Sequence, residues 1–125
     1  MTGTPDPQPA VRDLADLRDR LRAFAAARDW DQFHSPKNLA MALIAEAAEL
    51  VEHFQWLRED QSHDLAPDKR AEVAAELADV LAYLVRLADK LEIDLLAAVT
   101  AKLTVNETRY PATKVRGSAR KYTEY

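Results

Sequence analysis

Near its middle the chain reads Leu39-Ala-Met-Ala-Leu-Ile-Ala-Glu-Ala-Ala-Glu-Leu50, and further on it reads Glu76-Leu-Ala-Asp79. In the first segment Leu39, Leu43 and Leu50 recur at the spacing of one helix face. The surrounding sequence is rich in alanine, leucine, glutamate and arginine, and positions 4 to 116 contain no glycine. Because hairpin turns favour glycine, the pattern predicts an all-α fold.

Composition narrows the class of protein further. The chain has 125 residues, of which 48% are hydrophobic and 30% charged, so it suits one folded domain and not a disordered chain. Its net charge of −4 argues against a nucleic-acid binder or a membrane-surface protein. The absence of cysteine excludes disulfides, thiolate zinc sites and a cysteine nucleophile, and it is compatible with the cytoplasm that we predict. No apolar run approaches the roughly 20 residues of a membrane span.

Start and stop signals divide the chain into four predicted helices. Ser35 caps a helix with Pro36 in its first turn, Pro67 opens the next helix, and Asp94 caps another that stops before Pro111. The predicted helices cover residues 11–28, 36 to about 58, 67–91 and 94–109, with a polar loop at 59–66. We expect a four-helix bundle that oligomerises, with the domain at residues 11–111, a flexible tail at 1–10 and an extended tail at 112–125.

Carboxylates border the apolar stripes of the second and third predicted helices. Glu46 and Glu49 are three residues apart, as are Glu76 and Asp79, so each pair shares a helix face. With Glu46 at zero on a helical wheel, Leu50 falls at about 40°, and Trp56 falls about 80° to the other side. If the two apolar faces pack together, four carboxylates converge, which is costly without a cation.

A metal site and a simpler arrangement both remain open at this point. The simpler one is that these are solvated acids on amphipathic helices. A di-iron centre does not fit this sequence. Di-iron carboxylate bundles use Glu-x-x-His motifs, and here no glutamate is followed by histidine three residues later. Oxygen ligands suit Mg²⁺, with Mn²⁺ as a substitute, and phosphate chemistry; the number of ions stays open.

Several motifs also carry a family resemblance. They are Arg28-Asp-Trp-Asp-Gln-Phe-His34, Pro36-Lys-Asn-Leu39, Glu46-x-x-Glu49, Phe54-Gln-Trp56, Glu76-Leu-x-Asp-Val-Leu-x-Tyr83, Lys102, Asn106, Arg109-Tyr-Pro111 and Arg120-Lys-Tyr-Thr-Glu124. With them the chain resembles the all-α nucleoside triphosphate pyrophosphatases of the MazG-like superfamily, and most closely their dCTP pyrophosphatase branch. The two acidic pairs are common to the superfamily, whereas the aromatic motifs point to the dCTP branch.

The resemblance implies roles for individual residues. Glu46, Glu49, Glu76 and Asp79 would bind Mg²⁺. The base and sugar would meet Trp30, His34, Trp56 and Tyr83, and the triphosphate would meet Lys102, Asn106, Arg109 and Tyr110. On chemical grounds we assign the general base to Glu49. Ordinary packing or solvation is the alternative for each tryptophan, His34, Tyr83 and the cations.

The predicted activity is hydrolysis of dCTP, or of a related or modified pyrimidine deoxynucleotide, to the monophosphate and pyrophosphate. Such an enzyme would remove unwanted nucleotides from the pool and, by the resemblance, would work as a homodimer or homotetramer. A promiscuous nucleoside triphosphate pyrophosphatase and a dUTP pyrophosphatase are alternatives. A non-catalytic helical interaction module is a further alternative from another class of protein.

Overall fold

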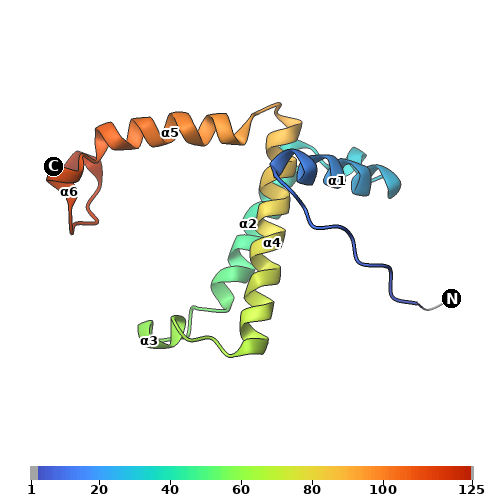
Figure 1. Cartoon of the computed structure of the whole chain (residues 1–125), viewed down its shortest axis with the longest axis horizontal. Helices are drawn as coiled ribbons and strands as arrows, with labels where there is room; N and C mark the ends of the chain where they lie inside the picture. The colour runs from blue at the N-terminus through green and yellow to red at the C-terminus, as the bar shows by residue number, and fades with distance from the viewer. Residues whose placement is uncertain (1–2, 125) are drawn as a thin grey trace. The chain divides into compact units, whose positions relative to one another are not determined.

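The computed structural model describes residues 3–124, and every regular element in that range is helical (Figure 1). The all-α prediction is therefore confirmed. The elements are α1 (Leu14–Ala27), η1 (Asp31–Phe33), α2 (Pro36–Glu52), α3 (Glu59–Ser62), α4 (Pro67–Lys90), α5 (Leu95–Arg109), α6 (Ala112–Val115) and η2 (Tyr122–Glu124).

Helix starts follow the capping signals of the sequence. The Ser35 side chain accepts a hydrogen bond from the backbone N–H of Asn38, and Asp94 does the same for Ala97. Prolines occupy the first turns of α2 and α4, where a missing N–H costs nothing. The first helix begins at Leu14 instead of residue 11, because Asp13 caps it.

The end of α2 corrects the sequence prediction. The helix stops at Glu52, and His53–Trp56 form a turn. The N–H groups of its first three residues bond back to the carbonyls of Leu50 and Val51. The predicted continuation to residue 58 is wrong, and so is the helical-wheel position given to Trp56. The apolar spacing of Phe54 and Leu57 imitates one more helical turn without forming it.

Two segments predicted to lack helix contain short helical turns. The loop at 59–66 holds α3, which Ser62 closes by donating its hydroxyl hydrogen to the Glu59 carbonyl. The C-terminal segment at 112–124 holds α6 and η2. Turns this short contain too few residues to show a helical periodicity of apolar positions, so the sequence pattern does not predict them.

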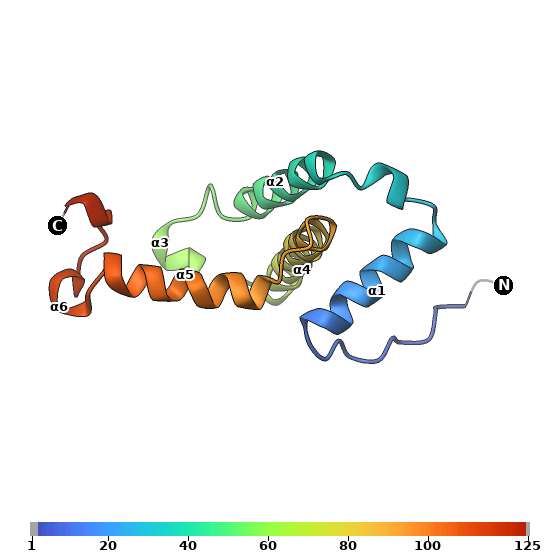
Figure 2. The ribbon, with the colours of Figure 1, turned by 90° about the horizontal axis from the view of Figure 1, so that it is seen from above.

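The chain divides into two compact units at Leu91. In the first unit α2 and α4 lie side by side and run antiparallel, and α1 packs on α4 (Figures 1 and 2). Its core is formed by Ala25, Leu39, Val73, Val85 and Ala88. Three of the four predicted long helices thus pack together, and the four-helix bundle itself stays a prediction.

The second unit contains α5, α6 and η2. Within it the rings of Tyr110 and Tyr122 meet edge to face at 6.0 Å, and the Arg109 guanidinium lies 4.5 Å from the centre of the Tyr122 ring. These contacts fold the end of the chain back onto the end of α5. Across residues 3–124, no helix has the length and hydropathy that crossing a bilayer requires.

Candidate metal centre and adjoining pocket

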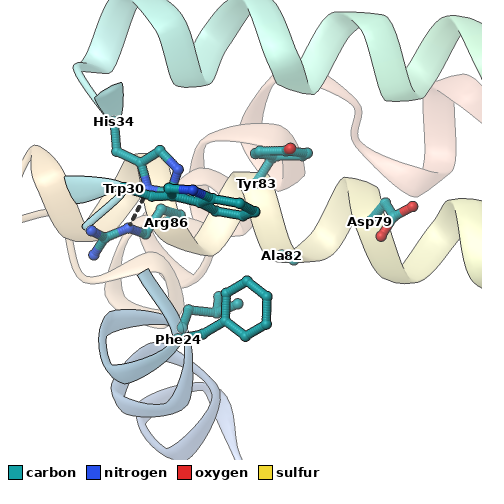
Figure 3. Close-up of a pocket in the computed structure, with 8 residues that line it drawn as sticks. Phe24, Trp30, His34, Asp79, Ala82, Tyr83 and Arg86 are labelled. Atoms are coloured by element: carbon teal, nitrogen blue, oxygen red, sulfur yellow. Dashed lines mark hydrogen bonds between the residues drawn. The ribbon is translucent and has the colours of Figure 1, made fainter. Parts of the chain in front are cut away.

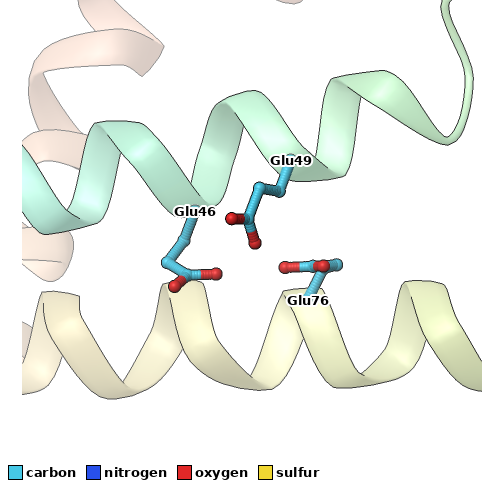
Figure 4. Close-up of side chains that lie close together, drawn as sticks. All are labelled: Glu46, Glu49 and Glu76. Carbon is cyan, nitrogen blue, oxygen red and sulfur yellow. The ribbon is translucent and has the colours of Figure 1, made fainter.

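Helices α2 and α4 bring three glutamates together. Glu46 and Glu49 lie one turn apart on α2, and Glu76 faces them from α4 (Figure 4). Each offers a carboxylate oxygen, and the three oxygens all lie within 4.8 Å of one another. Three of the four predicted metal ligands therefore converge, as expected if the two apolar faces pack.

This cluster concentrates negative charge in a partly buried place. Burial, followed by the hydrogen bond and charge of Glu49, raises the pKa of Glu46 to about 7. Glu76 and Asp79 add contributions of the same sign. The Oε2 atoms of Glu46 and Glu76 are buried and have no hydrogen-bond partner among residues 3–124. Because partnerless buried carboxylate oxygens are costly, the arrangement favours a cation.

The donor set fits a hard divalent cation. All three groups supply oxygen, which Mg²⁺ and similar ions prefer, and they come from two helices that are packed together. Asp79, the fourth predicted ligand, lies outside this group of three. It is exposed one turn further along α4, close enough for its charge to raise the pKa of Glu46.

His53 is a neighbour of the cluster that the sequence analysis gave no role. Its Nε2 lies 3.7 Å from Glu76, and its Nδ1 lies 3.8 Å from Glu72 and 3.4 Å from the Lys69 ammonium. The spacing of four residues from Glu49 was the signal available in the sequence. His53 connects the cluster to the charged side chains at the start of α4.

A pocket of about 280 Å³ is lined by Asp79, whose charge acts on Glu46 of the cluster. Figure 3 shows the side chains that surround it, which come from α1, the connection around η1, and α4. Trp30 and Phe24 form one wall, with ring centres 5.8 Å apart in an edge-to-face arrangement. The full lining consists of Leu21, Phe24, Trp30, His34, Asp79, Ala82, Tyr83 and Arg86. Three of the four residues predicted to meet the base and sugar thus share one pocket.

Polar contacts in this pocket centre on Arg86. Its Nε donates to Nδ1 of His34 at 3.2 Å, and its Nη2 donates to Asp31 at 2.6 Å. Burial, and then the positive charges of Arg86 and Lys90, lowers the pKa of His34, while the charge of Asp31 opposes this effect. The pocket therefore pairs aromatic faces with a neutral imidazole.

The comparison with protein families bears directly on this site. The model of the MazG-like family matches residues 42–125, which include both acidic pairs and the whole of α5. This chain belongs to the MazG-like family. The carboxylate cluster of α2 and α4 therefore lies inside the part of the chain that defines its family.

Individual relatives match over most of this MazG-like chain. Human dCTP pyrophosphatase 1 is 46% identical over 120 residues, which cover 94% of this chain and 69% of the human protein. The bovine protein of the same name is 47% identical over 113 residues, covering 89% and 67%. A solved pyrophosphatase from Archaeoglobus fulgidus DSM 4304 is 40% identical with a TM-score of 0.75, covering 85% of this chain and 99% of its own.

The remaining predicted site residues of the MazG-like chain are not among those that line the pocket. Trp56 follows the end of α2, is 87% exposed, and does not line the pocket. Lys102, Asn106 and Arg109 lie on α5, where their spacing places them on one helix face, and Tyr110 caps that helix. All four belong to the second unit, and their contact with a triphosphate stays a prediction.

Proposed function

We propose that this protein is a magnesium-dependent pyrophosphatase that converts dCTP to dCMP and pyrophosphate and so removes unwanted nucleotides from the pool. The observation that carries the proposal is the position of Asp79, which lines the aromatic pocket and acts electrostatically on the carboxylate cluster. A base held in the pocket and phosphates held at the cluster would then be neighbours. The identity to dCTP pyrophosphatase 1 supports dCTP as the substrate.

The chemistry follows from the carboxylates. Glu46, Glu49, Glu76 and Asp79 would hold Mg²⁺, which when bound neutralises charge on the phosphate oxygens. Glu49 is exposed, so water reaches its carboxylate. Glu49 is therefore the residue that we propose as the general base. The water oxygen bonds to a phosphorus that carries the α–β bridging oxygen, and the bond between that phosphorus and the bridging oxygen breaks. The products dCMP and pyrophosphate separate, and Glu49 accepts the proton of the water.

Substrate binding is divided between the two ends of dCTP. Trp30 and Tyr83 offer ring faces for the base and sugar, and His34 offers a polar edge within the same pocket. Lys102, Asn106, Arg109 and Tyr110 supply hydrogen-bond donors suited to phosphate oxygens. Trp56 remains in the proposal from the family motif, as a residue that contacts the base.

We also propose that the protein works as a homodimer or homotetramer. The single chain leaves large apolar side chains of α2 and α4 exposed, including Met41, Ile44, Leu77 and Leu81. Ile44 is 68% exposed, far more than a core residue. Apolar surface of this extent is typical of an interface between subunits. Light scattering of the purified protein measures its mass in solution and so tests the homodimer or homotetramer.

A nucleotide panel tests the function. The protein is incubated with each common ribo- and deoxynucleoside triphosphate in Mg²⁺, and the products are identified. Selective conversion of dCTP to dCMP and pyrophosphate is the expected result. Equal turnover of all nucleotides would replace dCTP selectivity with a promiscuous pyrophosphatase, and preference for dUTP would reassign the base. A complete lack of turnover in Mg²⁺ and Mn²⁺ would reject the enzymatic function and favour a non-catalytic helical interaction module.

Replacing Trp30 by alanine tests the base pocket. We expect KM for dCTP to rise about 5- to 150-fold, because aromatic stacking on a base contributes about 1–3 kcal/mol. Phe33→Ala is the matched control, since Phe33 lies three residues away, is exposed, and does not line the pocket. Equal KM values for the two variants would show that the base binds elsewhere.

A further inference from the structure

Arg86 is a buried charge for which the proposed chemistry has no use. It lies on α4, one turn beyond Tyr83, and only 6% of its surface is exposed. A buried guanidinium is costly unless its donors are satisfied. It donates to His34 through Nε, to Asp31 through Nη2, and to Asp89 through Nη1 at 3.4 Å.

A frame of ion pairs fixes the orientation of this guanidinium. Asp89 also accepts a hydrogen bond from Arg22 of α1, with its Nε at 2.7 Å, and Asp31 also accepts one from Lys90. Each aspartate thus binds Arg86 and a second cation. Because the two carboxylates engage Nη1 and Nη2, the Nε–H of Arg86 is directed at His34.

This contact determines where His34 carries its hydrogen. An arginine guanidinium has donors and no acceptor, so Nδ1 of His34 must present its lone pair. A neutral imidazole that accepts at Nδ1 carries its hydrogen on Nε2. Burial and the neighbouring cations lower the pKa of His34, which keeps the ring neutral.

The free edge of the imidazole belongs to the pocket. His34 lines the pocket, and Figure 3 shows Nδ1 turned to Arg86 while the opposite edge of the ring turns to the side where Tyr83 lies. The group presented there is an N–H donor. Cytosine has an acceptor at its ring N3, whereas uracil and thymine carry a hydrogen on that atom.

We propose that Arg86 is a positioning residue that holds His34 as the Nε2–H tautomer, so that the pocket offers a donor to the acceptor edge of cytosine and disfavours uracil and thymine. This inference rests on the proposed function and deepens it. Without Arg86 the ring is free to adopt the other tautomer, whose Nε2 acceptor matches the N3–H of uracil. The expected cost is a loss of about 10- to 100-fold in selectivity.

The tautomer is measured directly by nitrogen NMR of the imidazole rings, without substrate. The chain has three histidines, and the His34→Gln variant assigns the signal of His34. In the wild type we expect a protonated Nε2 and an unprotonated Nδ1. In Arg86→Met we expect a mixture of tautomers, and in Arg86→Lys, which keeps a donor, the wild-type tautomer. A wild-type spectrum with hydrogen on Nδ1 overturns the proposal even if Arg86→Met fails to fold.

Selectivity is measured as the ratio of kcat/KM for dCTP to that for dUTP. We expect the ratio to fall about 10-fold or more in Arg86→Met. In the matched control Arg20→Met, which removes a half-buried cation of α1 that pairs with Asp16 outside the frame around Arg86, we expect it to stay unchanged. An unchanged ratio in Arg86→Met overturns the proposal. If the wild type hydrolyses no nucleotide, the proposed function fails, and the spectrum together with binding of dCMP against dUMP still decides the role of Arg86.

Discussion

Turnover of dCTP by the Glu46→Gln variant is expected to fall by about 100-fold or more. The amide keeps the size of the side chain and one acceptor oxygen, but it removes the charge that would bind the metal. The same change removes repulsion from Glu49 and Asp79. We therefore expect the metal-free variant to unfold at a higher denaturant concentration than the wild type.

Glu52→Gln is the control for this experiment. It makes the same chemical change on the same helix, at an exposed position outside the carboxylate cluster. Turnover and denaturant midpoint are measured for both variants, with Mg²⁺ and after its removal by a chelator. Wild-type turnover in Glu46→Gln would exclude the proposed metal centre. A denaturant midpoint of metal-free Glu46→Gln no higher than that of Glu52→Gln would exclude repulsion among the carboxylates as a cause of lower stability.

Stabilisation of the protein by Mg²⁺ is expected to grow as the pH rises from 5.5 to 8. The pKa of Glu46 is raised from 4.5 to about 7 in the folded chain. Between these values the folded state holds a proton that the unfolded state releases, so the free energy of unfolding falls as pH rises through this window. A bound cation needs the carboxylate form, so Mg²⁺ displaces the proton at pH 6 and finds it already lost at pH 8.

His34 works in the opposite direction, since its pKa is lowered from 6.5 and its contribution to stability is lost as pH falls. The difference in slope between the wild type and Glu46→Gln isolates Glu46, because His34 is common to both. At a Mg²⁺ concentration of about 100 times Kd we expect Tm to rise by about 10 °C at pH 8. Calorimetry in two buffers counts released protons, and equal proton release at pH 6 and pH 8 would refute the assignment.

The sequence predicted those parts of the fold and site that depend on local chemistry. Ser35 and Asp94 mark helix starts because their side chains satisfy free N–H groups, and the structure confirms both. Glu46, Glu49 and Glu76 were found because a spacing of three residues fixes a helix face, and the packing of two such faces brings them together.

What the sequence did not predict depends on tertiary contacts. The end of α2 at Glu52 was missed because Phe54 and Leu57 continue its apolar spacing, and no glycine or proline marks the stop. Arg86 was missed because its role is created by Asp31, His34 and Asp89, two of them more than 50 residues away along the chain. From sequence alone, a charged residue in an amphipathic helix is expected to be exposed to solvent, and only its tertiary partners show otherwise.

The two orphan oxygens of Glu46 and Glu76 also have a thermodynamic consequence for metal affinity. Folding alone brings the ligands together. The entropy lost in assembling them and the work of bringing like charges together therefore lower the free energy of unfolding of the metal-free chain. The incoming ion then meets a preorganised receptor and recovers that work as binding free energy. The metal-free protein is less stable than its packing would allow, and its affinity for a divalent ion is greater by the same amount.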